Sequence, residues 1–469
     1  MKKLKIATIK KYFLYFLSPV LFFSYHPVLT VGKNASMNLE FSLPLIWLLC
    51  FSIISLPTAF IFLKNKNNKI PLLSIIFPIF TTISIFWTPN KLRGVLTTGV
   101  FWCIWIAIIS IYDFLKKIKN KEQFKKTFLK IFFISTGVVC LFCWLQCILD
   151  VVGVSRGATL LCAGCVSQTF GFPHPNGFAI EPQFMGNLLI LPSLISLYFL
   201  FEAENKSQKI FLTITTFLFT GTLFLTFSRG AIYSFCVAIV VLLSFEILQK
   251  KNLKKLLIIP ILLISFLFSL SMQGVFAAAS KTNDTFLTGI SKSINQLSLG
   301  LVNFTQKDEA PKRQESDPEE NSSTFDGYVE ESTNTRLSLS EIALKAWINK
   351  PVTFVFGYGI GSAGTILNVF DDNVDSDKQI VQNEPIEIAL ELGLFGLVMT
   401  FALGILTFKI IKKSNQKSLF FAILLAFVIS FLFFSGFPNA LHIFLLPPAL
   451  FLLLENQSIV NQITHHHCR

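Results

Sequence analysis

Long apolar runs separated by short polar connections dominate this chain. A helix needs about 20 mainly apolar residues to cross a bilayer, because lipid offers no partner for free backbone N–H and C=O groups. Twelve runs approach this length, at residues 12–31, 41–63, 70–88, 94–114, 129–151, 184–203, 210–227, 231–248, 256–279, 386–411, 418–434 and 443–455. The pattern predicts an all-α polytopic membrane protein with about twelve transmembrane helices.

One long polar segment interrupts the pattern after the ninth run. It divides the chain into a membrane region at 1–279, a polar domain at 280–384, and three further spans with a tail at 385–469. Within the polar domain, residues 305–335 are charged, rich in Pro and Ser and poor in apolar residues, which predicts a mobile acidic lobe.

An amphipathic helix is predicted directly after that lobe. Its first residue would be capped by Asn334 or Thr335, and Pro351 would end it. Its apolar residues recur at helical spacing: Leu339, Ile342, Ala343, Ala346 and Trp347.

Lysines indicate which side of the membrane is cytoplasmic. Alternate connections are rich in lysine, whereas the opposite short loops carry only Lys33, Lys91, Arg93, Arg156 and Arg229. By the positive-inside rule both termini are cytoplasmic, and the 280–384 domain lies outside the cell membrane. The basic start resembles a signal peptide but lacks a small-residue cleavage site, so we expect an uncleaved first span.

The overall composition agrees with this interpretation. Of 469 residues, 52% are hydrophobic and only 14% are charged, which excludes an ordinary soluble globular protein. The net charge of +13 comes from lysines in short loops rather than from one basic face. The lysines therefore determine the orientation of the chain in the membrane, and we expect a lipid bilayer, not nucleic acid, as the partner.

Arginines on the outer side are the first candidates for chemistry. Arg229 lies between two apolar runs, next to the small residues Ser228 and Gly230. A guanidinium at that depth is costly unless it meets an anion, and it matches phosphate in a bidentate fashion. The alternative is an arginine that reaches lipid headgroups. Arg336 at the start of the amphipathic helix, and Arg156 in an outer loop, are weaker candidates.

Carboxylates form the second group of candidates. Glu181 precedes Pro182 where an outer loop re-enters the membrane, and it is either a general base or a carboxylate that stabilises a helix N-terminus. Glu384, Glu387 and Glu391 recur at spacings of three and four, so they share a helix face. Three carboxylates facing lipid would be costly, so this face should point to a cavity or to the outer domain.

The remaining motifs give no cofactor. GYGIGSAG (357–364) lacks the Gly-Lys-Ser/Thr ending of a nucleotide-binding loop. Cys162 and Cys165 have no second pair, so zinc is not expected, and His174 is more typical of a loop histidine than of a catalyst. We expect neither a metal nor a cofactor.

Four segments together resemble the O-antigen polymerase and O-antigen ligase superfamily of bacterial envelope glycosyltransferases. They are FGFPHPNGFAIEPQFMGNLLILP (170–192), LTFSRGAIYS (225–234), TRLSLSEIALKAWINKPVTFVFGYGIGSAG (335–364) and QNEPIEIALELGLFGLV (382–398). The resemblance implies metal-independent, inverting glycosyl transfer on the outer face of the cytoplasmic membrane. Donor and acceptor would be undecaprenyl-diphosphate-linked oligosaccharides, and other polysaccharide-assembly proteins could join them as partners.

The resemblance also implies roles for particular residues. By motif, Arg229 and Arg336 would bind the lipid diphosphate, with Arg156 as a further candidate. Ligases of the family carry a His-Asn pair whose histidine is the proposed base, and the matching residues here are Gln382 and Asn383. Glutamine cannot act as a base, which favours a polymerase; Glu384 and Glu181 are then the candidates to activate the acceptor hydroxyl.

Two alternatives remain open. A ligase would pass the finished glycan to another acceptor, and a histidine close in space, such as His174, would revive that reading. A transporter or flippase of lipid-linked sugars would place ionisable residues at mid-membrane and show inverted repeats, whereas here the charges cluster at the outer rim.

Overall fold

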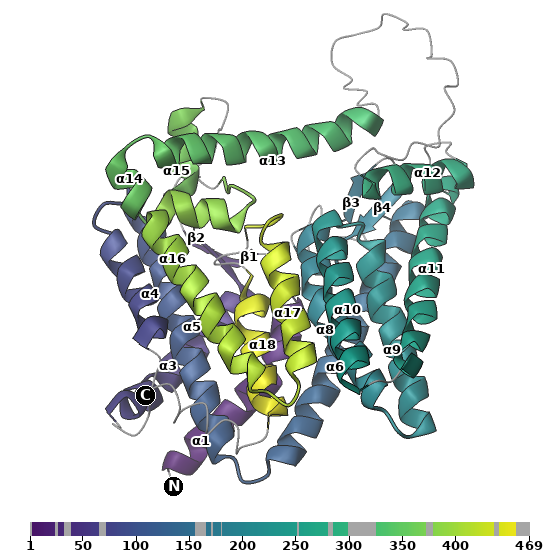
Figure 1. The fold of residues 1–469 in the computed structure, drawn as a ribbon, viewed down its shortest axis with the longest axis horizontal. Coiled ribbons are helices and arrows are strands. Elements are labelled where there is room, and N and C mark those ends of the chain that lie inside the picture. The colour runs from purple at the N-terminus through teal and green to yellow at the C-terminus, as the bar shows by residue number, and fades with distance from the viewer. Residues whose placement is uncertain are drawn as a thin grey trace, which may run out of the picture.

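The computed structural model describes residues 2–23, 27–31, 39–64, 72–154, 166–169, 172–179, 181–250, 253–279, 285–298, 325–371, 379–435 and 440–455. Over these ranges the chain is a helical bundle with two short antiparallel hairpins (Figure 1). The hairpins pair β1 (Pro27–Val31) with β2 (Leu39–Ser42), and β3 (Val166–Thr169) with β4 (Phe172–Pro175). The all-α class is confirmed.

In the described part of the chain, eight helices are long and apolar enough to cross a membrane. They are α3 (Leu43–Lys64), α5 (Lys91–Lys117), α6 (Lys121–Val151), α8 (Pro182–Glu202), α9 (Lys206–Leu225), α10 (Arg229–Lys250), α11 (Ile258–Ala279) and α16 (Glu384–Lys412). Three shorter apolar helices occupy three other expected spans: α4 (Leu72–Ser84), α17 (Lys417–Ser430) and α18 (Leu441–Leu454). A multi-pass membrane protein is thus confirmed, and the count of twelve stays a prediction.

The first expected span is not one continuous helix, so that prediction is wrong. Residues 12–31 are divided between α1 (Lys2–Tyr15), α2 (Leu17–Phe23) and β1. Pro19 accounts for the break, because a proline has no N–H to donate to the carbonyl four residues earlier and its ring crowds that carbonyl. In this chain the carbonyl belongs to Tyr15, where α1 ends.

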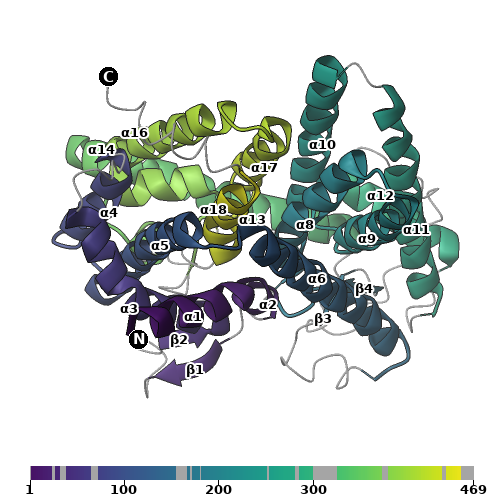
Figure 2. The same cartoon turned by 90° about the horizontal axis from the view of Figure 1, so that it is seen from below.

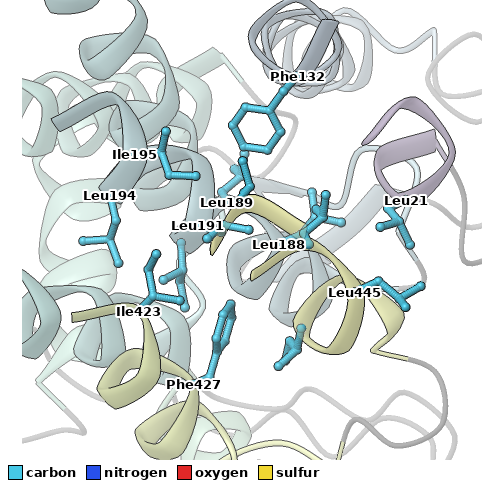
Figure 3. Close-up of a cluster of buried hydrophobic side chains, with 14 of the residues drawn as sticks. Leu21, Phe132, Leu188, Leu189, Leu191, Leu194, Ile195, Ile423, Phe427 and Leu445 are labelled. Carbon is cyan, nitrogen blue, oxygen red and sulfur yellow. The ribbon is translucent and has the colours of Figure 1, made fainter. Parts of the chain in front are cut away.

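Helix α8 forms the centre of the bundle and is the most buried of the candidate spans. Its leucines and isoleucines contact four other helices (Figure 3). Phe132 from α6, Leu21 from α2, Ile423 and Phe427 from α17, and Leu445 from α18 surround it. Figure 2 shows α17 and α18 between the group α8–α11 and the group α3–α5 with α16. The middle of α8 is therefore enclosed from several sides.

The lysine-rich turns lie at one end of the bundle, where a buried ionic cluster joins three helices and the short 3-10 helix η2 (Leu253–Leu257). Lys255 of η2 contacts Glu246 of α10 and Glu202 of α8, the latter at 3.6 Å. The Ser418 hydroxyl of α17 donates to Glu246 at 2.6 Å. A buried charge of this kind needs both a partner and hydrogen bonds, and the cluster supplies both.

The opposite end carries the more polar helices α12 (Phe286–Leu297), α13 (Phe325–Ile348), α14 (Pro351–Phe356) and α15 (Ala363–Phe370) (Figure 1). Helix α13 buries Leu339, Ala343 and Ala346 against α15 and against Leu390 of α16, which confirms the predicted apolar face. It begins at Phe325, so the predicted cap at residue 334 or 335 is wrong. The rest of the predicted lobe, 305–324, lies outside the described residues.

The glycine-rich turn at 357–361 joins these outer helices to the membrane region. Helix α16 is interrupted at Gly393, which has φ +66°, and the carbonyls of Leu390 and Glu391 accept N–H donors from Tyr358 and Gly359 at 2.9 and 2.8 Å. A Cβ on Gly393 would overlap the Val355 carbonyl. The motif is thus a close backbone contact that satisfies the groups released by the break.

We expect Gly393→Ala to lower the apparent melting temperature of the detergent-solubilised protein clearly. The left-handed backbone alone costs an alanine about 1–2 kcal/mol, and the overlap with Val355 adds to this cost. Gly404→Ala is the matched control in the same helix, since no atom lies within 4 Å of the added Cβ. The control should melt at the wild-type temperature or above it. Equal melting temperatures for the two variants would contradict the proposed role of the contact.

Candidate functional site

The start of α8 contacts the outer helix α13. Glu181 is the N-cap residue with an extended backbone (φ −147°), its side chain does not cap the helix, and Pro182 occupies the first turn. The Gln183 amide oxygen accepts a hydrogen bond from Nη2 of Arg336 at 2.8 Å. The loop that re-enters the bundle therefore delivers Glu181 and Gln183 to the guanidinium of α13.

Two opposing effects act on the Glu181 carboxyl. The protein around it raises its pKa above the ordinary 4.5, although part of the residue reaches the surface. The positive charge of Arg336 offsets part of that rise. A carboxylate whose pKa is raised is a better proton acceptor than an ordinary surface carboxylate, which is the property a general base requires.

The start of α10 carries Arg229 after a tight turn. Phe227 in this turn has φ +48°, a conformation that costs a bulky residue on the order of 1–3 kcal/mol. The Thr226 hydroxyl accepts the Ser228 N–H at 3.3 Å, and a Cβ on Gly186 of α8 would press on Ser228 at 2.9 Å. Close packing of small residues thus holds the turn against α8.

The end of α17 joins these starts together. The α17 terminal turn, Phe431–Phe433, follows the last helical residue, so its carbonyls have no partner within the helix. Phe433 O accepts from the Gln183 amide, Leu432 O from the Asn383 amide at 3.0 Å, and Phe431 O from the Glu384 N–H at 2.9 Å. One turn thereby binds the starts of α8 and α16.

The same turn packs on the start of α10. A Cβ on Gly230 would meet Phe433 at 2.8 Å, and the rings of Tyr233 and Phe433 lie edge to face at 6.5 Å. The positive charge of Arg229 also acts on the Tyr233 hydroxyl. The helix starts that carry Arg229, Gln183 and Glu384 therefore meet at the α17 terminal turn, and Gln183 brings Arg336 to the same place.

The predicted sequence Gln382-Asn383-Glu384 forms the start of α16. Asn383 is the N-cap residue, and its side chain accepts the Ile386 N–H at 3.2 Å. Gln382 has φ +61°. Over the described ranges, Gln382 and Phe227 are the two residues other than glycine that have a positive φ. Each of the two comes one or two residues before a candidate site residue. Local strain of this kind is often concentrated at functional sites.

The two further carboxylates of α16 hold the outer helices. Glu387 accepts the Val381 N–H and Glu391 accepts the Ala363 N–H, each at 3.0 Å. Arg93 of α5 contributes a positive charge to both. The carboxylate face of α16 therefore points to the outer segment, as predicted, and Glu387 and Glu391 bind backbone N–H groups there.

His174 lies close to the Arg229 turn. Its ring stacks on Phe227 with centroids 5.5 Å apart and an interplanar angle of 15°. Its side chain is 3% exposed, and this burial lowers its pKa to about 3, so the imidazole is neutral at physiological pH. A histidine does stand near the site in space, as the ligase alternative requires, but it is shielded from solvent.

The remaining predicted residue is Arg156, which lies outside the described residues. Conversely, Gln183, Tyr233 and Phe433 belong to the site and were not singled out from the sequence. Gln183 had a signal, because it lies next to Glu181-Pro182 at a predicted helix start. Phe433 had none, since it is one of 52 phenylalanines in the chain. Across the described ranges, no group of three His, Cys, Asp or Glu side chains could hold a metal ion.

Comparison with known proteins identifies part of the chain. Residues 214–401 match the family model described as O-antigen ligase, whereas none of the curated proteins compared with the chain matches it. The matched segment runs from α9 into α16 and contains Arg229, Arg336 and 382–384, but not Glu181. The family comprises enzymes that transfer glycans as ligases or polymerases. Residues 214–401 are thus an O-antigen ligase family domain.

Proposed function

We propose that the protein polymerises undecaprenyl-diphosphate-linked oligosaccharides on the outer face of the cytoplasmic membrane. The acceptor sugar hydroxyl attacks the anomeric carbon of the donor glycan, and the bond from that carbon to the diphosphate oxygen breaks. The configuration inverts, undecaprenyl diphosphate leaves, and the lengthened glycan remains on the acceptor lipid. No metal takes part.

The observation that carries the proposal is the meeting of helix starts at the α17 terminal turn. This arrangement brings the helices that bear Arg229 and Arg336 to one place at the end of the bundle away from the lysine-rich turns. A departing diphosphate gains negative charge as the glycosidic bond breaks, and fixed guanidinium groups stabilise that charge in the transition state. Arginine suits this role because its planar donors match phosphate oxygens and it stays charged.

The proton of the acceptor hydroxyl needs a base. We assign this role to a carboxylate, with Glu181 as the first candidate and Glu384 as the second. Glu181 has the raised pKa, a partly exposed position and the neighbouring charge of Arg336. Glu384 is only 8% exposed, so its carboxyl is less accessible than that of Glu181.

A ligase is the second candidate, because the matching family model is described as O-antigen ligase and His174 lies beside the Arg229 turn. The polymerase is favoured by Gln382, which stands where ligases carry their histidine and has no basic nitrogen. The two reactions differ in the acceptor. Purified protein supplied only with a defined undecaprenyl-diphosphate oligosaccharide should produce a ladder of longer lipid-linked products. Transfer that requires a different acceptor would establish the ligase instead.

Arg229→Ala and Arg336→Ala should each reduce elongation by about 10²–10³-fold, the loss typical of removing one donor that stabilises transition-state charge. The assay is the lipid-linked product ladder, normalised to the amount of folded protein in the membrane. Lys345→Ala is the matched control on α13, since Lys345 is exposed and paired with Glu341 at 2.6 Å. Ladders of normal length in both arginine variants would rule out the mechanism.

The pH profile should identify the base. A base must be deprotonated, so activity falls as the pH drops through its pKa. Because the pKa of Glu181 is raised, the acid limb should lie above pH 4.5. Glu181→Gln should lower kcat and remove this limb, while Glu384→Gln should keep it. If only Glu384→Gln removes the limb, the assignment of the base passes to Glu384.

A further inference from the structure

We propose that Gln146 is a positioning residue for the diphosphate site. It holds the β4 hairpin so that His174 keeps Phe227 in the backbone conformation from which α10 begins at Arg229. This inference rests on the proposed function, and it adds a residue on α6, outside the matched family segment.

Gln146 clamps the turn that follows β4 with three hydrogen bonds, two to the Gly177 backbone and one from its nitrogen to the Asn176 side-chain oxygen at 3.4 Å. Its side-chain oxygen accepts the Gly177 N–H at 2.9 Å, and its nitrogen donates to the Gly177 carbonyl at 3.1 Å. The side chain is fully buried. Because a buried backbone group without a partner is costly, these bonds fix the turn to α6 at one position.

The turn has little freedom to settle elsewhere. Gly177 has φ +58°, and a Cβ on it would press on Cys143 and Met185, both at 3.1 Å. Phe178 stacks on Phe142 of α6 with ring centroids 4.3 Å apart and nearly parallel planes. The hairpin is therefore seated on α6 by a backbone clamp and by an aromatic stack.

The β3–β4 hairpin also contacts the turn that precedes Arg229. His174 stacks on Phe227, whose left-handed backbone requires outside support because it is disfavoured for an aromatic residue. On the other side, α8 packs so closely that a Cβ on Gly186 would overlap Ser228 and Ala231. The Arg229 turn is thus held between α8 and the hairpin, and loss of the clamp would let Phe227 relax and re-aim the guanidinium.

The test compares Gln146→Met in two backgrounds. Methionine has a similar shape but offers Gly177 neither strong donor nor strong acceptor. In the wild-type background we expect the KM for the undecaprenyl-diphosphate donor to rise about tenfold, with a smaller change in kcat. In the Phe227→Gly background the same change should raise KM by less than about twofold, because glycine adopts a positive φ unaided.

Ser269→Ala is the control for general destabilisation. It removes another buried hydrogen bond, from Ser269 to the Gly221 carbonyl at 2.7 Å, between α11 and α9. It should lower the apparent melting temperature without raising the donor KM. A donor KM unchanged by Gln146→Met, or raised equally in both backgrounds, would overturn the positioning role.

Failure of the proposed function would look different. In the same assay, Arg229→Ala should raise the donor KM or lower kcat, whether or not Gln146→Met has an effect. If Arg229→Ala has the KM and kcat of the wild type, the proposal that Arg229 binds the diphosphate is wrong, and so is the positioning role of Gln146. If Arg229→Ala is impaired but Gln146→Met is not, only the positioning role is wrong.

Discussion

The carbonyl groups at the end of α17 are the feature on which the site depends. A helix leaves its last carbonyls without internal partners, and at the edge of an apolar bundle these groups must find donors. Here Phe431, Leu432 and Phe433 receive donors from Gln183, Asn383 and Glu384. The need of these carbonyls for hydrogen-bond donors therefore brings the N-terminal ends of α8 and α16 together. Candidate site residues lie at those two helix ends.

The same requirement explains the connection between the outer helices and the membrane region. The break at Gly393 releases carbonyls inside α16, and the glycine-rich turn supplies their donors. Glu387 and Glu391 add two more bonds to the outer backbone. Helix α13 packs on this assembly through α15 and Leu390, so the placement of Arg336 depends on this interface as well as on its hydrogen bond to Gln183.

The sequence predicted the features that depend on residues close together in the chain, and it missed those that depend on contacts between distant segments. The all-α class, the carboxylate face of α16 and the importance of Arg229 follow from local patterns: apolar length, helical spacing, and a charge at a helix end. The boundary of α13 was missed because its first ten residues, FDGYVEESTN, are mostly polar or small and directly follow a charged stretch rich in Pro and Ser. The role of Phe433 could not be predicted, since a phenylalanine near a helix end has this role only if Gly230 leaves room for its ring.

The relation between Gln382 and the carboxylates is the last step of the argument. If this position supplies a base in ligases, a chain with glutamine there must obtain its base elsewhere in the same site. Glu181 would fit this demand, because desolvation raises the pKa of its carboxyl while the positive charge of Arg336 offsets part of the rise. Arg336 would then have two functions, stabilising the departing diphosphate and tuning the base. In the proposed reaction, one side chain, held at the start of α8 by its hydrogen bond to Gln183, would connect proton removal with leaving-group departure.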